Sequence, residues 1–149
     1  MPKTTRRLVS VAVLILAVSL VGAVLAYIWG WQTQLGSDNP NITIGELAAR
    51  GSVTSIPLAP LIALAIFALL ARSRRWWGAL AVVGRCLLAV VFFAASLAEV
   101  EALFIPSYPR AVLLTSVTVY ILLALALLLS GILDLVDRVQ TRRSVSARV

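Results

Sequence analysis

Apolar and polar residues alternate along this chain in long blocks, and the lengths of the blocks predict membrane-spanning helices. Residues 8–29 form a run without any charged side chain, and further apolar blocks cover about 56–71, 77–98 and 111–133. A helix needs about 20 mostly apolar residues to cross the roughly 30 Å hydrocarbon core of a bilayer. We therefore expect four transmembrane helices, of which the second is short.

The polar segments between these blocks predict the connections. Residues 30–55 form the longest of them and are expected to be a loop outside the membrane. Within this loop, Thr43 and Glu46 have the spacing of a capping box, and Gly51 is a typical helix stop. This pattern favours a short interfacial helix over the alternative, an irregular loop. Residues 134–149 are predicted to be a polar tail on the cytoplasmic side.

The distribution of basic residues predicts how the chain is oriented. Ten of the 13 lysines and arginines fall in the N-terminal segment, the connection between the second and third blocks, and the C-terminal tail. The two opposite loops contain only Arg50 and Arg110. Basic residues are enriched in cytoplasmic loops, so both termini are expected to be cytoplasmic. With short connections, the fold class is an all-α membrane protein, a four-helix antiparallel up-down bundle.

Composition agrees with this fold class and excludes others. Hydrophobic residues make up 61% of the 149 residues and charged residues 13%, whereas soluble domains have about 25% charged residues. The net charge of +7 does not indicate nucleic acid as a partner, because the basic residues form short clusters between apolar blocks. The bias toward arginine, alanine, valine and leucine favours a bacterial origin, and therefore the bacterial inner (cell) membrane.

The first apolar block could also be read as a secretory signal peptide. The apolar region of a signal peptide is usually about 7–15 residues, and the uncharged run of residues 8–29 is longer. We therefore expect this block to remain in the protein as the first span.

Arg85 is the one charged residue inside the predicted third span. A charge at that depth costs at least about 2.5 kcal/mol on insertion scales, so it requires an explanation. Its side chain could extend to the cytoplasmic headgroups, pair with Asp134 at the inner end of the fourth span, or line a functional polar path. We expect one of the first two, with Arg85 and Asp134 as a structural pair.

Other candidates for polar chemistry are few. Thr115 and Thr118 lie in the fourth span, where they could line a polar cavity or bond to their own backbone. Glu99 and Glu101 lie at a membrane surface, where such a pair is usually solvated. The chain has one cysteine and no histidine, which removes the commonest general base and metal ligand. We expect no catalytic site, no metal and no cofactor.

These observations rank three functions. The first is a non-catalytic subunit or assembly factor of a larger membrane complex, which requires a protein partner in the bilayer, whereas a homo-oligomer belongs to the second. The second is a small oligomeric transporter or channel, for which Arg85 favours an anion over a cation. The third is an envelope sensor that uses the outer loop 30–55.

Overall fold

A computed structural model of the chain describes residues 3–30, 43–52, 54–73, 76–98, 100 and 110–146. Five helices account for nearly all of them: α1 (Lys3–Trp29), α2 (Ile44–Arg50), α3 (Leu58–Leu70), α4 (Trp76–Ala98) and α5 (Arg110–Ser146). The described residues contain no β-strand, which confirms the predicted all-α class.

Three helices are long and apolar enough to cross a membrane, over Val9–Trp29, Trp76–Ala98 and Arg110–Thr141. The fourth apolar helix, α3, has 13 residues, which corresponds to roughly 20 Å. It begins after Pro57, whose missing N–H has no intrahelical partner to lose. The structure thus shows three candidate spans and, at the position of the predicted short second span, one shorter apolar helix.

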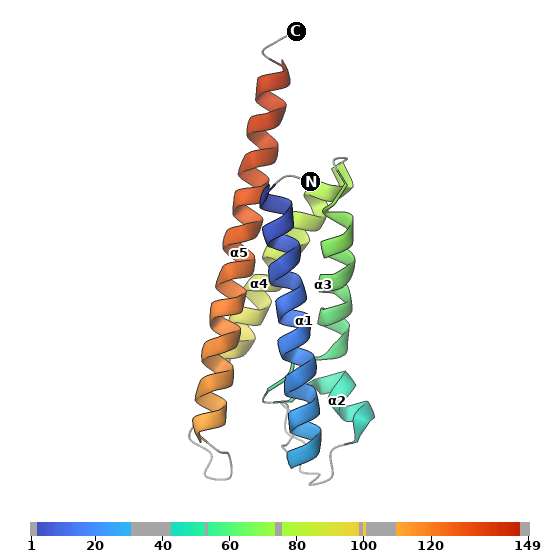
Figure 1. The fold of residues 1–149 in the computed structure, drawn as a ribbon, viewed down its shortest axis with the longest axis vertical. Coiled ribbons are helices and arrows are strands. Elements are labelled where there is room, and N and C mark those ends of the chain that lie inside the picture. Colours follow the sequence, from blue (N-terminus) through green and yellow to red (C-terminus); the bar gives the residue numbers. More distant parts are fainter. Residues whose placement is uncertain are drawn as a thin grey trace.

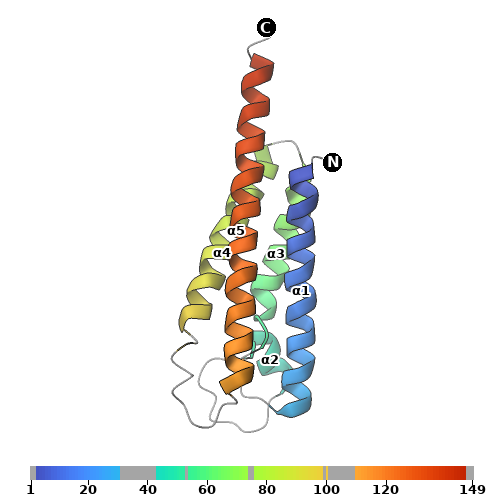
Figure 2. The same ribbon diagram turned by 60° about the vertical axis from the view of Figure 1, so that its left-hand side comes forward.

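The four apolar helices lie side by side, and successive ones run in opposite directions (Figures 1 and 2). Helix α1 packs against α3 and α5, and α4 packs against the same two helices. The start of α1 and the end of α5 are at one end of the molecule, which we call the tail end. Helix α2 is at the opposite end, which we call the loop end.

The buried apolar side chains form one main cluster and two smaller ones. Each of the four apolar helices contributes to the main cluster, which includes Ile15, Leu64, Phe92 and Leu127. The opposite faces of the helices expose large apolar side chains, such as Leu20, Leu87 and Leu129. In a bilayer these outward faces contact lipid rather than water, which accounts for their apolar side chains.

Helix α2 forms as the capping box predicts. The Thr43 hydroxyl accepts a hydrogen bond from the Glu46 backbone N–H, and the Glu46 carboxylate accepts one from the backbone N–H of Thr43. Gly51 ends the helix with φ of 71°, a conformation that favours glycine. Residues 31–42 and 53 of the predicted loop lie outside the described part of the chain.

Helix α5 continues beyond the predicted end of the fourth span at Leu133. It runs through Asp134 to Ser146, which makes it roughly 55 Å long, and its last part projects beyond the other helices (Figure 1). The described part of the predicted polar tail is therefore helical, because polar residues can continue a helix. Asp134 and Arg138 even form an ion pair one turn apart.

Candidate functional site

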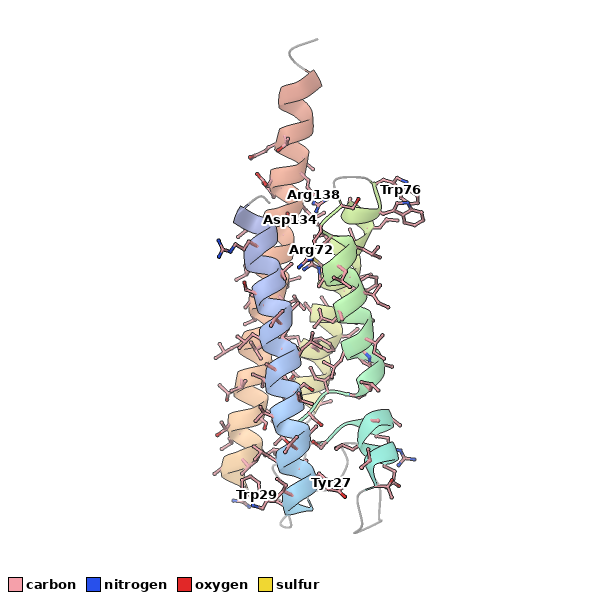
Figure 3. All side chains as sticks on the ribbon, turned by 45° about the vertical axis from the view of Figure 1, so that its right-hand side comes forward. Tyr27, Trp29, Arg72, Trp76, Asp134 and Arg138 are labelled. Carbon is pink, nitrogen blue, oxygen red and sulfur yellow. The ribbon has the colours of Figure 1, made fainter. Side chains whose placement is uncertain are left out.

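Two polar features interrupt the apolar helices, and they lie at opposite ends of the molecule. The first is a cluster of Arg85 on α4 with Asp134 and Arg138 on α5, and Figure 3 shows the last two at the tail end. Arg85 is completely buried and Asp134 almost completely. The second is the segment that joins α2 to α3, together with a cavity beside it at the loop end.

Arg138 makes three hydrogen bonds in the tail-end cluster. Its Nε donates to Asp134 Oδ2 at 3.1 Å. Its two terminal nitrogens donate to the backbone carbonyls of Ser73 at 3.1 Å and Ala71 at 2.5 Å. Carbonyls at a helix C-terminus lack intrahelical partners, so Arg138 satisfies the end of α3 from a different helix. Gly78 makes this approach possible, because a Cβ there would lie 2.8 Å from Arg138 Nη1 and closer still to the Ser73 carbonyl.

Arg85 has different surroundings, and they correct the predicted pair with Asp134. None of its three guanidinium nitrogens has a hydrogen-bond partner in the structure. Asp134 attracts it electrostatically, but the hydrogen-bonded ion pair of Asp134 is with Arg138. The side chain is also fully buried rather than extended to a headgroup surface. Sequence spacing places Arg85 and Asp134 at the same depth, but it cannot show that a third residue, Arg138, is the one that hydrogen-bonds to the Asp134 carboxylate.

At the loop end, residues 51–57 form a non-helical inserted segment between α2 and α3. Ser52 and Ser55 exchange two backbone hydrogen bonds of 3.0 and 3.1 Å, which close a tight turn. Their hydroxyls lie 2.8 Å apart and are also hydrogen-bonded. Ser52, Thr54 and Ser55 are all buried, so this turn is packed inside the protein.

The neighbouring helices satisfy the backbone of the inserted segment. On α1, the Ser19 hydroxyl accepts from the Ile56 N–H at 2.9 Å, and the Gly22 carbonyl accepts from the Thr54 hydroxyl at 2.7 Å. On α5, the Tyr120 hydroxyl donates to the Thr54 carbonyl at 2.7 Å. Ser19 and Gly22 lie roughly 10–15 Å along α1 from Trp29. At such depth irregular backbone is tolerated only where protein or a polar cavity satisfies it.

Gly22 is required for this packing. A Cβ at this position would overlap the Thr54 carbonyl oxygen, at 1.7 Å. Only glycine lets the inserted segment lie directly on the surface of α1.

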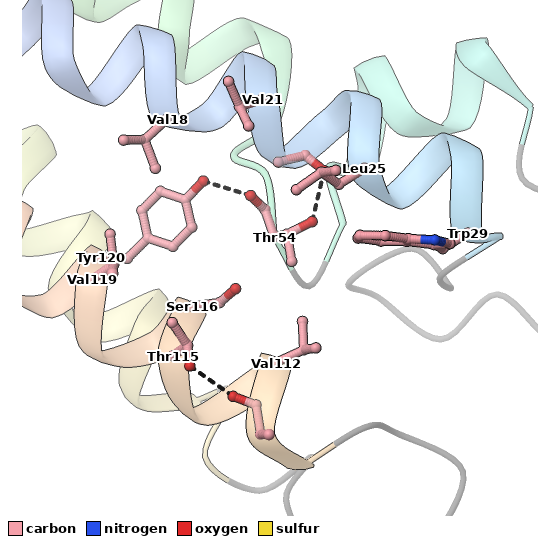
Figure 4. Close-up of a pocket in the computed structure, with 12 residues that line it drawn as sticks. Val18, Val21, Leu25, Trp29, Thr54, Val112, Thr115, Ser116, Val119 and Tyr120 are labelled. Atoms are coloured by element: carbon pink, nitrogen blue, oxygen red, sulfur yellow. Dashed lines mark hydrogen bonds between the residues drawn. The ribbon is translucent and has the colours of Figure 1, made fainter.

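Beside the inserted segment, a cavity of about 430 Å³ lies between α1 and α5. Its walls are Val18, Val21, Gly22, Leu25 and Trp29 on α1, Thr54, and Ala111, Val112, Thr115, Ser116, Val119 and Tyr120 on α5. Figure 4 shows these apolar side chains around the space, with the Tyr120–Thr54 hydrogen bond at one side. The cavity is open rather than enclosed and is nearly all apolar.

The structure separates the two predicted threonines of the fourth span. Thr115 lines the cavity, whereas Thr118 does not. Both are exposed and donate to backbone carbonyls one turn earlier, those of Ala111 and Leu114. Glu99 and Glu101 lie outside the described residues. Among the residues that are described, no group of three or more histidine, cysteine or acidic side chains could hold a metal ion.

Sequence reasoning missed the residues that bind the inserted segment. Ser19 and Thr54 were not singled out, because each is an ordinary residue in its own segment. One signal was present: three of residues 52–55, Ser-Val-Thr-Ser, are hydroxyl residues, directly before an apolar block too short to cross alone. Arg138 was placed in the tail, because its partners on the α3–α4 connection are distant in sequence.

Fold and surface together define an α-helical integral membrane protein. The exposed aromatic side chains fit this class: Tyr27 and Trp29 are at the loop end, and Trp76 and Trp77 at the tail end (Figure 3). The indoles of Trp76 and Trp77 stack with ring centroids 3.6 Å apart. Aromatic residues at both ends of apolar helices are typical of the two membrane–water interfaces. Comparison with protein-family models, curated proteins and solved structures gave no match.

Proposed function

We propose that the chain crosses the membrane four times with both termini in the cytoplasm, and acts as a non-catalytic subunit or assembly factor of a larger membrane complex. The alternating directions of α1, α3, α4 and α5 (Figure 1) support the topology, as does the excess of basic residues toward the tail end. In a bacterium, the membrane is the inner one.

For α3, the inserted segment completes the crossing. The helix alone reaches roughly 20 Å, and the described residues 51–52 and 54–57 add further depth as non-helical chain. The Ile56 N–H and the Thr54 carbonyl bond to Ser19 and Tyr120, and the Thr54 hydroxyl donates to the Gly22 carbonyl. These groups meet the requirement that chain at membrane depth has its polar groups satisfied by protein.

The observation that carries the proposed role is the filled interior. The space between the four apolar helices holds packed side chains from all of them, and these leave the centre apolar. Such a protomer is a scaffold with lipid-facing surfaces on every helix. It offers partners apolar faces and a rigid frame, which suits an accessory subunit.

Purification from native membranes tests this role. We expect the tagged full-length chain, extracted in mild detergent, to retain a stoichiometric protein partner through salt washing, identified by mass spectrometry. An unrelated four-span protein with the same tag is the control for proteins that co-purify non-specifically. Recovery of the chain only as a homo-oligomer would contradict the accessory role.

Arg85 supports one alternative, a small anion channel or transporter that works as an oligomer. Its guanidinium is buried in a candidate span without a hydrogen-bond partner, and intramembrane charges commonly mark ion pathways. In this case, liposomes with the purified oligomer should show chloride flux that Arg85→Gln abolishes and Arg72→Gln, at the exposed end of α3, preserves. Flux equal to that of empty liposomes would refute this alternative.

A further inference from the structure

The cavity between α1 and α5 has a structural cause. Near the tail end the two helices pack directly, through Ala12 and Ile15 on α1 against the α5 side of the core. At the loop end the inserted segment rests on Gly22 of α1 and binds Tyr120 of α5. Helices α1 and α5 are thus linked through a polar bridge, and the space of about 430 Å³ beside that bridge is left open.

The size of this space suits a single hydrocarbon chain. The lining residues of α5 run from Ala111 to Tyr120, roughly 14 Å along the helix. A hydrocarbon chain is much narrower than a helix, which is about 10–12 Å wide, and a space of about 430 Å³ has room for it.

The chemistry of the walls also fits a hydrocarbon chain. Apart from Thr54, Thr115, Ser116 and Tyr120, the lining consists of glycine and apolar side chains. The hydroxyl groups of two of these polar residues already form hydrogen bonds within the protein. Tyr120 donates to the Thr54 carbonyl, and Thr54 donates to the Gly22 carbonyl. The lining residues lie within the candidate spans of α1 and α5, apart from Thr54, so the open side faces the acyl region of a bilayer.

A positive charge lies next to the α5 end of the cavity lining. Arg110, which is exposed, is the first residue of α5 and directly precedes the lining residues Ala111 and Val112. The N–H groups of the first turn of a helix have no intrahelical partners and favour an anion. Trp29 lines the cavity from α1, at the position where interfacial aromatics lie against lipid headgroups.

We propose that this cavity is a binding site for one membrane phospholipid. One acyl chain lies between α1 and α5 and reaches toward Tyr120, and the phosphate lies at the N-terminus of α5 near Arg110. The size, polarity and position of the cavity select the acyl chain, and the charge of Arg110 beside it selects a phospholipid with a net negative headgroup over a zwitterionic one.

Photolabelling of the full-length protein tests the site. The protein is reconstituted into phosphatidylcholine liposomes that contain a small fraction of phosphatidylglycerol with a diazirine on its acyl chain. After illumination, peptide mass spectrometry locates the adducts. We expect saturable labelling, near one lipid per protomer, on lining residues such as Val21, Val112 and Val119. Labelling spread over exposed side chains such as Leu87 and Leu129 in proportion to their exposure would overturn the proposal.

A pair of matched variants separates the cavity from the general lipid surface. The Ser116 side chain points into the cavity (Figure 4), whereas Thr118, two residues later on the same helix, is exposed and outside it. Ser116→Phe fills the space and should lower labelling of the lining residues by roughly tenfold, because the acyl chain of the lipid cannot occupy the volume that the phenyl ring takes. Thr118→Phe should leave that labelling unchanged. Equal labelling in the two variants would overturn the assignment, and the wild-type adduct map decides the question if Ser116→Phe does not fold.

The headgroup and the native occupant have their own tests. Arg110→Gln should remove the preference for labelled phosphatidylglycerol over a labelled phosphatidylcholine of the same chain, without moving the adducts. An unchanged preference would refute the role of Arg110.

Lining residues that are labelled in liposomes but protected in native membranes would mean that a partner protein fills the cavity, which also overturns the lipid assignment.

Discussion

At the scale of single residues, the two arginines of the tail-end cluster differ in what surrounds their guanidinium groups. Arg138 makes three hydrogen bonds, to Asp134 and to two backbone carbonyls. Arg85 makes none, although it is completely buried. Because Asp134 and Arg138 already neutralise each other, Arg85 adds an uncompensated positive charge to the interior. Burial of such a charge is unfavourable.

We therefore predict that substitutions of the two arginines have opposite effects on stability. Arg85→Met should raise the free energy of unfolding by about 1–3 kcal/mol, the usual cost of an unsatisfied buried polar group. Loss of the attraction to Asp134 offsets a part of this gain. Thermal unfolding of the purified protein in detergent, followed by circular dichroism, measures the change.

Arg138→Met should lower the free energy of unfolding by about 1–3 kcal/mol, because it leaves Asp134 and the end of α3 unsatisfied. Arg72→Met, the loss of an exposed charge at the same end of the molecule, is the control and should change little. If Arg85→Met destabilises the protein as much as Arg138→Met, the guanidinium of Arg85 has bonding partners that stabilise the fold. A stabilising Arg85→Met would instead indicate that the charge is kept for function.

At the scale of elements, the inserted segment determines how α1, α3 and α5 are joined at the loop end. Its side chains and backbone form hydrogen bonds with both long helices. Removal of one partner leaves a buried polar group without a bond, which costs more than the bond itself contributes.

Tyr120→Phe should therefore loosen the inserted segment. The change leaves the ring in place but removes the donor to the Thr54 carbonyl, at a cost of about 1–3 kcal/mol. Hydrogen–deuterium exchange in detergent should show faster exchange at the Thr54–Ile56 amides and little change in α4. Tyr27→Phe, which alters an exposed tyrosine of α1, is the matched control. Equal exchange rates in the two variants would show that the Tyr120 hydroxyl is not needed to hold the segment.

Features that rest on neighbours in sequence could be predicted, and those that rest on distant contacts could not. The helix α2 follows from Thr43 and Glu46, three residues apart. The apolar helices follow from block length alone. By contrast, Thr54 is hydrogen-bonded to Gly22, which is 32 positions away in the sequence, and to Tyr120, which is 66 positions away. The cavity depends on those bonds, and its lining was recognised in part only, through Thr115.

At the scale of the whole molecule, the proposed topology places the tail end in the cytoplasm and the loop end outside. Cys86 is half-buried in α4, so a Cys86→Ala background allows new cysteines to report on each side. We predict that Gln140→Cys in α5 reacts with a membrane-impermeant maleimide only after the cells are opened. Gly45→Cys in α2 should react in intact cells. Cysteines at both positions reacting from the same side would contradict the three crossings that the proposed topology places between them.

The shortness of α3 bears on the order in which the protein is built. During synthesis α1 emerges first, and α3 follows as an apolar stretch of roughly 20 Å that the polar inserted segment directly precedes. Alone in hydrocarbon, that segment would have unbonded polar groups. Two of its acceptors already stand on α1: the Ser19 hydroxyl for the Ile56 N–H, and the Gly22 carbonyl for the Thr54 hydroxyl. We therefore expect α1 and α3 to partition into the bilayer as a hairpin, so that the first helix serves as the insertion partner of the second.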